Sequence, residues 1–393
     1  DLEEACGNDR LAGFPASVVA LADDTAPSSS GNTPREAIHH LQPLLLIVQH
    51  HGTQLHLEFG VAKCKLLITA KPHKLKAVET LLKSEPNILT FYDSPVSLVE
   101  DYYVHLGVPQ APRHQSKLIV DYRLGRATDL TNLMQEVTKN AFRGINPTSN
   151  RNIFLCYNQP TFLYGLDTVD INKTELERLE RKYRTVLKRF LSVPDQTSTP
   201  GTYLSIEICP AEAQRDLDIM SLLGQLALSP DDLQNVRKIV KHHLEEYPSD
   251  FLGWSGLTRR TAYKYGLPDP LQYLENPWRP DRWRKHCKEI IFNHWDQKLK
   301  EAAEEQQNEG KSLELFDVSD LSISKPHRLW EAAGKTSIEV TKACIVNWML
   351  MGVFLTRDKL YKYKKIDSSI CIFCRSSETV SYTHLTLPTT PYV

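Results

Sequence analysis

Apolar side chains recur at helical spacing along most of this chain, whereas apolar runs of strand length are concentrated in its first third. Residues 173–190 carry the clearest helical pattern. Asn172 and Glu175 have capping-box spacing at its start, and Pro194 follows its end. The apolar stripe consists of Leu176, Leu179, Tyr183, Val186, Leu187 and Phe190. Further helices are predicted over residues 33–50, 117–141, 214–227, 231–246 and 337–365.

Short apolar runs predict strands at residues 18–22, 55–59 and 66–69. Residues 104–108 predict a tight hairpin in which Gly107 permits close approach of the backbone. The pattern therefore predicts an α+β fold that is mostly α.

Composition places the chain among globular proteins of two or three domains, because it has 393 residues and 41% of them are hydrophobic. Its net charge is −1, so any nucleic-acid binding has to come from local basic patches. The eight cysteines give no disulfide framework, and the longest apolar run, residues 345–355, is too short to span a bilayer. We expect a soluble protein of the cytoplasm and/or nucleus, without a membrane partner.

The first candidate for chemistry is an aspartate doublet, Asp23 and Asp24, directly after the strand at residues 18–22. Two carboxylates at a strand end suit Mg²⁺ and the two-metal chemistry of phosphoryl transfer. A second doublet, Asp231 and Asp232, precedes a helical pattern and fits a helix start. From the residues alone, a solvated turn at Asp23 and Asp24 is the ordinary alternative.

Several segments occur in the order found in the reverse transcriptases of LINE-type (non-LTR) retrotransposons. Residues 21–26 (LADDTA) resemble their (F/Y)-A-D-D-T box, and residues 59–65 (FGVAKCK) resemble their lysine-containing palm segment. Residues 105–108 (HLGV) resemble the Y-L-G-V turn that contacts the primer. Residues 160–168 (PTFLYGLDT) and a Cys-x2-Cys pair followed by Glu378 continue the likeness.

The resemblance implies catalytic roles for Asp23 and Asp24, with Asp23 as a direct ligand of Mg²⁺ or Mn²⁺ and Asp24 supporting it. It places Lys63 near the incoming nucleotide, and Leu106 and Gly107 at the primer. RNA template and DNA primer would be the partners. A solvated lysine and a plain hairpin remain the ordinary alternatives for these last segments.

The helix at residues 173–190 resembles a polymerase thumb helix, and its basic side can follow a phosphate backbone. The implied nucleic-acid-binding residues are Arg178, Arg181, Lys182, Lys188 and Arg189. The alternative is a solvated helix surface that Glu175, Glu177 and Glu180 partly neutralise. Further on, residues 278–288 interleave tryptophan with arginine and lysine, which suits either stacking on unpaired bases or anchoring of a helix to a core.

Near the end of the chain, Cys371 and Cys374 resemble the start of a Cys-x2-Cys…His…Cys zinc knuckle. A tetrahedral zinc site needs four ligands, whereas here His384 is loosely spaced and no cysteine follows it. Zn²⁺ is therefore expected only if the knuckle were complete. The last residues resemble translated sequencing-adapter sequence and are not expected to be native.

The resemblance implies an incomplete right-hand polymerase palm of short antiparallel strands, followed by a helical thumb and a helical C-terminal region. Pro27 departs from the family's pattern, and its missing N–H is expected to weaken the hairpin that presents the metal ligands. The expected divisions are 1–115 (partial palm), 116–246 (thumb-like), 247–365 (helical region), 366–379 (truncated knuckle) and 380–393 (adapter-like tail).

Two functions follow as expectations. The first is a fragment of an RNA-directed DNA polymerase, since the chain begins with Asp1 and little precedes the aspartate doublet. The second is a non-catalytic nucleic-acid-binding remnant of a retroelement. A decayed reading frame without a selected function is a third reading, to which Pro27 and the adapter-like tail both point.

We expect no primer extension by this 393-residue chain alone. In the resembled enzymes a further metal-binding aspartate lies on an earlier palm strand, and two metal ions need that carboxylate. The measurement is extension of a DNA primer on an RNA template with Mg²⁺. Clear extension that Asp23→Ala abolishes would contradict this expectation.

Overall fold

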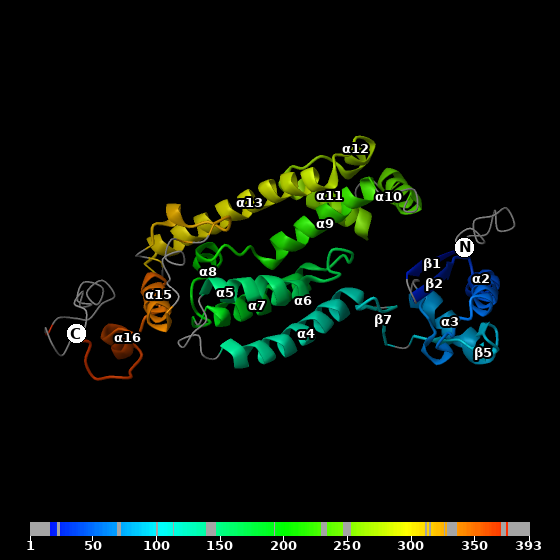
Figure 1. Ribbon diagram of the computed structural model, residues 1–393, viewed down its shortest axis with the longest axis horizontal. Coiled ribbons are helices and arrows are strands. Elements are labelled where there is room, and N and C mark those ends of the chain that lie inside the picture. Colours follow the sequence, from blue (N-terminus) through cyan, green and yellow to red (C-terminus); the bar gives the residue numbers. More distant parts are fainter. Residues whose placement is uncertain are drawn as a thin grey trace. The chain divides into compact units, whose positions relative to one another are not determined.

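The computed structural model divides the chain into two compact units, which meet in sequence at Leu118 and Ile119 (Figure 1). Each unit is considered by itself. The residues that the structure describes are 16–21, 24–68, 72–99, 101–112, 114–138, 147–191, 193–228, 234–246, 253–310, 313, 316–325, 327, 336–370 and 375.

The first unit is built on an antiparallel hairpin and a long helix. Strand β1 (Ala16–Leu21) pairs with β2 (Asp24–Ser29), and α2 (Pro34–Gln54) packs against both strands. Thr33 and Glu36 form a capping box at the start of α2. The helix predicted at residues 33–50 is thus confirmed. Its buried apolar side chains are Ile38, Leu41, Leu44 and Val48.

The hairpin forms even though Pro27 lies within β2. Pro27 pairs with Val18, and pairing continues to Ser29. A strand with a single partner tolerates proline where the proline nitrogen points away from that partner. The expected weakening of this hairpin is therefore not seen in its pairing.

Short elements complete the first unit. They are the 3₁₀ turn η1 (Val61–Lys63), α3 (Pro72–Ser84), and the strands β3 (Lys65–Leu66), β4 (Thr90–Phe91), β5 (Ser94–Pro95), β6 (Ser97–Leu98), β7 (Tyr103–His105) and β8 (Val108–Gln110). The described strands form four separate two-stranded ladders. One of them, β3 with β6, is parallel rather than antiparallel as expected.

The strand predicted at residues 55–59 is wrong. Leu55 and Leu57 donate their backbone N–H groups to carbonyl groups of the last turn of α2, at His51 and Gly52. His56 between them adopts φ 54°. The chain therefore folds back onto the end of the helix, which leaves no extended segment to pair.

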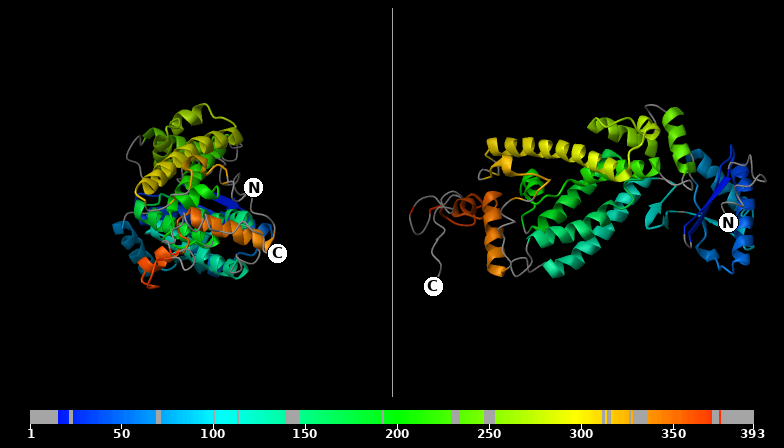
Figure 2. Two further views of the ribbon diagram at one scale, coloured as in Figure 1. Left: turned by 90° about the vertical axis from the view of Figure 1, so that its left-hand side faces the viewer. Right: turned by 45° about the horizontal axis from the view of Figure 1, so that its top comes forward.

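The second unit is almost wholly helical, and α4 begins just before it (Figures 1 and 2). Its elements are α4 (Gln115–Thr138), α5 (Pro147–Ile153), the π-helix η3 (Phe154–Asn158), α6 (Gln159–Leu163), α7 (Lys173–Phe190), α8 (Thr199–Ser205), α9 (Ala211–Ala227), α10 (Gln234–Glu246), α11 (Trp254–Tyr265), α12 (Pro270–Glu275), α13 (Pro280–Asn308), the 3₁₀ turn η5 (Val318–Asp320), α15 (Ser337–Leu350) and α16 (Arg357–Lys362). The α+β, mostly α class is confirmed.

Helix α9 lies at the centre of this unit and contacts α7, α11 and α13. Where α9 and α13 cross, a Cβ atom on Gly224 would come within 2.4 Å of the Trp283 ring. Trp283 stacks on Tyr273 at 3.9 Å between ring centroids, and its indole N–H donates to the carbonyl of Met220. The crossing therefore needs both a residue without a side chain and a fixed tryptophan.

The single helix predicted over residues 337–365 is instead two helices, α15 and α16. Val353 and Phe354 donate back to the carbonyl of Trp348, and Gly352 adopts φ 66°. This left-handed glycine ends α15 as a C-cap does. Thr356 then caps α16 by accepting from the N–H of Lys359.

None of the helices in the described part of the chain is both long and apolar enough to cross a bilayer.

Replacing Gly224 by alanine is expected to destabilise the second unit by about 1–3 kcal/mol, because the added methyl group clashes with Trp283, which is buried, stacked on Tyr273 and hydrogen-bonded to Met220. The free energy of unfolding in urea, followed by circular dichroism, measures this. Gly125→Ala in α4 is the matched control, since nothing lies within 4 Å of its Cβ position. That control should be neutral or stabilising, and equal losses for both variants would contradict the argument.

Candidate nucleic-acid interface

The β1–β2 hairpin carries the aspartate doublet. Its register pairs Leu21 with Asp24. Asp23 and the side chain of Asp24 lie outside the described residues. Ser29 at the far end of β2 donates its hydroxyl to the carbonyl of Ala37 at 2.7 Å and ties the hairpin to α2. Catalytic and Mg²⁺-binding roles for the two aspartates stay predictions.

Lys63 lies on the short turn η1 and is exposed. The Lys63 backbone N–H donates to the carbonyl of Gly60, and Val61 accepts from the N–H of Cys64. These bonds hold the lysine on a 3₁₀ turn just before strand β3. Its side chain is thus available to solvent, and its role toward a nucleotide stays a prediction.

The turn between β7 and β8 consists of Leu106 and Gly107. Both residues have positive φ, at 47° and 76°, which is the backbone of a primed hairpin turn. Leucine adopts this region at a cost of about 1–2 kcal/mol. Leu106 nevertheless occupies the tip and is 45% exposed. The predicted hairpin is confirmed, whereas its contact with a primer is untested.

The three predicted segments of the first unit belong to separate local structures rather than to one sheet. Asp24 lies on the β1–β2 ladder, Leu106 lies between β7 and β8, and Lys63 precedes the β3–β6 ladder. Among the described residues there is no group of three or more histidine, cysteine, aspartate or glutamate side chains that could hold a metal ion.

In the second unit, α7 is held firmly along its inner side. Asn172 caps the helix by accepting from the N–H of Glu175. Tyr183 is fully buried and makes edge contacts with the rings of Phe154 and Phe162. The further buried apolar positions of α7 are Leu179, Val186, Leu187 and Phe190.

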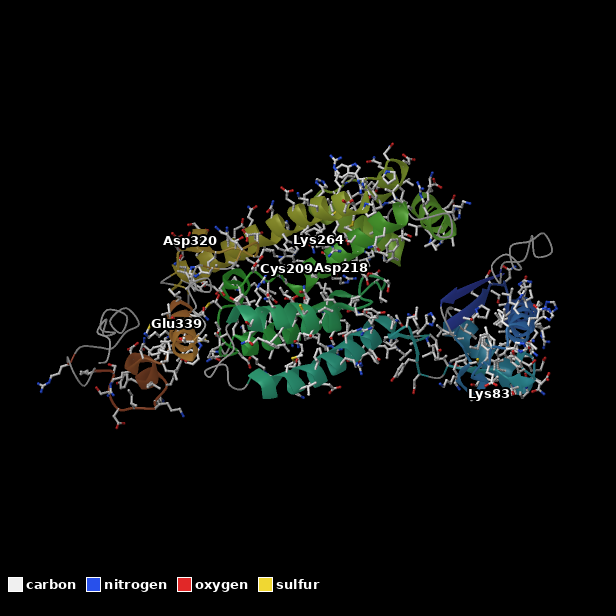
Figure 3. The ribbon with its side chains drawn as sticks, viewed as in Figure 1. Lys83, Cys209, Asp218, Lys264, Asp320 and Glu339 are labelled. Atoms are coloured by element: carbon white, nitrogen blue, oxygen red, sulfur yellow. The ribbon has the colours of Figure 1, made fainter. Side chains whose placement is uncertain are left out.

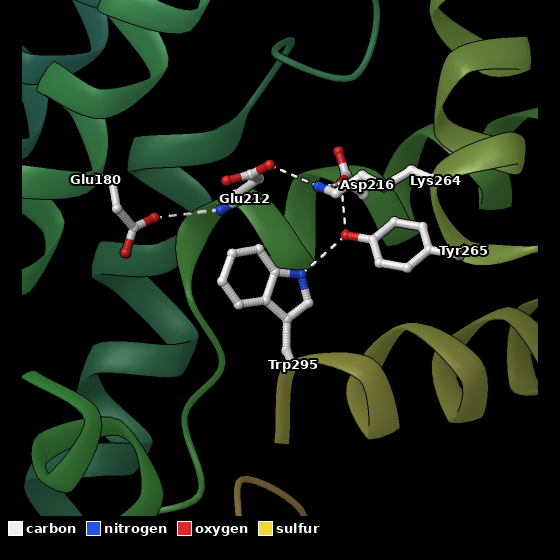
Figure 4. A network of polar contacts seen from close by, with 6 residues as sticks. All are labelled: Glu180, Glu212, Asp216, Lys264, Tyr265 and Trp295. Carbon is white, nitrogen blue, oxygen red and sulfur yellow. Dashed lines mark hydrogen bonds and ion pairs between the residues drawn. The ribbon is translucent and has the colours of Figure 1, made fainter. Parts of the chain in front are cut away.

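Glu180 fastens α7 to α8 and α9. Its carboxylate accepts from the hydroxyl of Tyr203. It also accepts, at 3.3 Å, from the backbone N–H of Glu212 (Figure 4). Burial raises the pKa of Glu180, and these two donors partly oppose the rise. The residue therefore anchors α7 to the two neighbouring helices.

A second polar network extends from α9 to α11 and α13 (Figure 4). The Lys264 ammonium reaches the carboxylates of Glu212 at 2.6 Å and Asp216 at 2.7 Å. The Tyr265 hydroxyl donates to Asp216 and accepts from the indole N–H of Trp295. No sequence pattern predicted this network, because its members come from three helices separated in sequence.

The outer side of α7 presents basic groups of different accessibility. Arg181 and Arg189 are exposed, and Lys182 is half-buried. Arg178 forms ion pairs with Asp121 of α4 and, at 3.0 Å, with Glu175. In the part of the chain that the structure describes, ion pairs are present at Arg178 but not at Arg181 or Arg189.

Lys188 does not belong to this exposed set, contrary to the expectation from helical spacing. It is 6% exposed, and its ammonium donates to the carbonyls of Asp195 at 2.7 Å and Thr197 at 2.6 Å. The chain beyond α7 folds over this position and covers it. Burial, followed by the nearby charge of Arg184, lowers the pKa of Lys188.

Two titratable groups near the α7–α9 contact are labelled in Figure 3. Burial raises the pKa of Asp218 to about 6, although the Gln214 amide and Arg284 oppose the rise. Burial also raises the pKa of the Cys209 thiol to about 12. Because a thiol with so high a pKa is protonated at neutral pH, Cys209 is not an activated nucleophile.

The remaining predicted ligands, Cys371 and Cys374, lie outside the described residues. Comparison of the chain with protein-family models, with curated proteins and with solved structures finds no match.

Replacing Lys188 by methionine is expected to destabilise the second unit by about 1–3 kcal/mol, because two carbonyl groups lose their donor in a covered site. Arg189→Met, at the adjacent exposed position, is the control and should change the free energy of unfolding by less than about 0.5 kcal/mol. Urea unfolding of both variants measures the difference. A larger loss for Arg189→Met would contradict the assignment.

Proposed function

We propose that this chain is part of a LINE-type reverse transcriptase and that α7 binds the phosphate backbone of a template-primer duplex. The observation that supports the proposal is that Arg181 and Arg189 are exposed on a helix whose opposite side is mostly buried. A helix held in this way presents its charges without having to order itself on binding.

The geometry of α7 suits a polyanionic rod. The helix has 18 residues and is about 27 Å long at the usual rise per residue. Arg181 and Arg189 are eight positions apart, so they lie on the same side, about 12 Å apart along the axis. Because such contacts are largely electrostatic and displace counterions, binding should weaken as salt rises.

The first unit supports the same proposal through the order of its elements. A hairpin whose second strand begins at Asp24, a packed helix, an exposed lysine and a second hairpin follow one another, as the resemblance implies. On this proposal Asp23 and Asp24 hold Mg²⁺, Lys63 faces the nucleotide, and Leu106 and Gly107 contact the primer. Polymerisation would use these groups together with a carboxylate from another strand.

The double variant Arg181→Gln/Arg189→Gln tests the proposed duplex interface. We expect its affinity for an RNA–DNA duplex to fall about tenfold near 0.1 M salt. The slope of log Kd against log salt concentration should decrease by about 2, because each lost phosphate contact removes about 1. Fluorescence anisotropy with a labelled duplex measures both quantities.

Lys238→Gln is the matched control, since Lys238 is an exposed cation on α10 in the same unit. It should leave affinity and slope unchanged. Binding by the double variant that equals that of the unchanged chain would refute the duplex interface. The Asp23→Ala variant should bind the duplex as tightly as the unchanged chain, because on this proposal the doublet takes part in catalysis rather than in duplex binding.

A further inference from the structure

Helices α12 and α13 follow one another at a corner that is remote in sequence from α7 (Figure 1). The segment between them carries an exposed aromatic ring among basic residues. Trp278 precedes α13 and is 37% exposed, whereas Trp283, one turn into the helix, is completely buried. The two tryptophans of this segment therefore differ in their exposure to solvent. Trp283 belongs to the core, and Trp278 lies at the surface.

The Trp278 side chain packs against residues of the first two turns of α13. Its ring meets Trp283 edge-on, with 5.9 Å between centroids and 88° between planes. The ring centroids of His286 and Trp278 are 5.0 Å apart. The Arg282 guanidinium carbon lies over the Trp278 ring, 5.2 Å from its centroid. The carbonyl of Trp278 accepts from the hydroxyl of Tyr273 at 3.3 Å. A fixed indole with part of its surface open is suited to stacking with little loss of entropy.

The charges around this ring are mainly positive. Arg279 is 84% exposed, Arg282 and Lys285 are exposed, and His286 is partly buried. The nearest acidic groups in sequence are Glu275 and Asp281, and Asp281 pairs with Arg279 at the long distance of 3.7 Å. An exposed pair of this kind holds its arginine weakly, so the guanidinium can turn toward an anion.

We propose that Trp278, with Arg279, Arg282 and His286, is a binding platform for single-stranded nucleic acid. An unpaired base replaces the Arg282 guanidinium over the indole, and Arg282 and Arg279 then contact the phosphates that flank this base. Paired bases cannot use the ring, since their faces are already stacked within the duplex. The platform therefore goes beyond the proposed function of α7, which concerns the backbone of a duplex.

The test compares Trp278→Leu with Trp278→Phe in the full chain, with labelled 20-nucleotide oligothymidylate and a blunt duplex of the same length as probes. Loss of one stacked base should weaken binding of oligothymidylate about tenfold, or about 1.4 kcal/mol. Trp278→Phe retains a ring and should stay within about threefold of the unchanged chain. Binding of the duplex should be the same for all three proteins.

Arg282→Gln should weaken oligothymidylate binding and reduce its salt dependence, whereas Lys238→Gln on α10 should do neither. Unfolding curves for each variant show whether the protein is folded. Unchanged oligothymidylate binding by folded Trp278→Leu overturns the platform, and so does an equal loss for duplex and single strand. The α7 double variant separates the two proposals, because it changes duplex binding whatever the result at Trp278.

Discussion

The close crossing of α9 and α13 is the constraint on which the helical unit depends. Gly224 allows the Trp283 ring to lie against the α9 backbone, and the indole N–H satisfies a carbonyl of the same helix. From this crossing α9 extends toward α7, where the N–H of Glu212 holds Glu180. The position of the basic helix is thus set by a contact made far from it in sequence.

The same crossing positions the surface tryptophan. Trp278 rests edge-on against Trp283, so whatever fixes Trp283 also fixes the exposed ring. The Lys264, Asp216 and Tyr265 network joins α9 to α11 and, through Trp295, to α13. Because buried polar groups of this kind are costly unless all are paired, the network favours one relative arrangement of the three helices.

Local signals explain which elements the sequence could predict. Helix α2 starts at a capping box of Thr33 and Glu36, and α7 starts at the N-cap Asn172. Both caps depend only on residues within one turn, so the sequence shows them. The strand expected at residues 55–59 failed because its backbone bonds return to the end of α2. Helix α15 ends where Gly352 adopts a left-handed conformation. The apolar run continues through this glycine, so the sequence pattern predicted a single longer helix.

Two pairs of chemically similar residues that are close in sequence show why the candidate site was only partly predictable. Lys188 and Arg189 are adjacent cations, yet one binds two carbonyls under a covering segment and the other faces solvent. Trp278 and Trp283 divide in the same way between surface and core. Helical spacing ranks positions by the side of the helix on which they lie, but it contains no information about a later segment that folds over them. Because the net charge is −1, any attraction of a polyanion depends on cations that remain uncovered. Tertiary contacts therefore decide which cations are available.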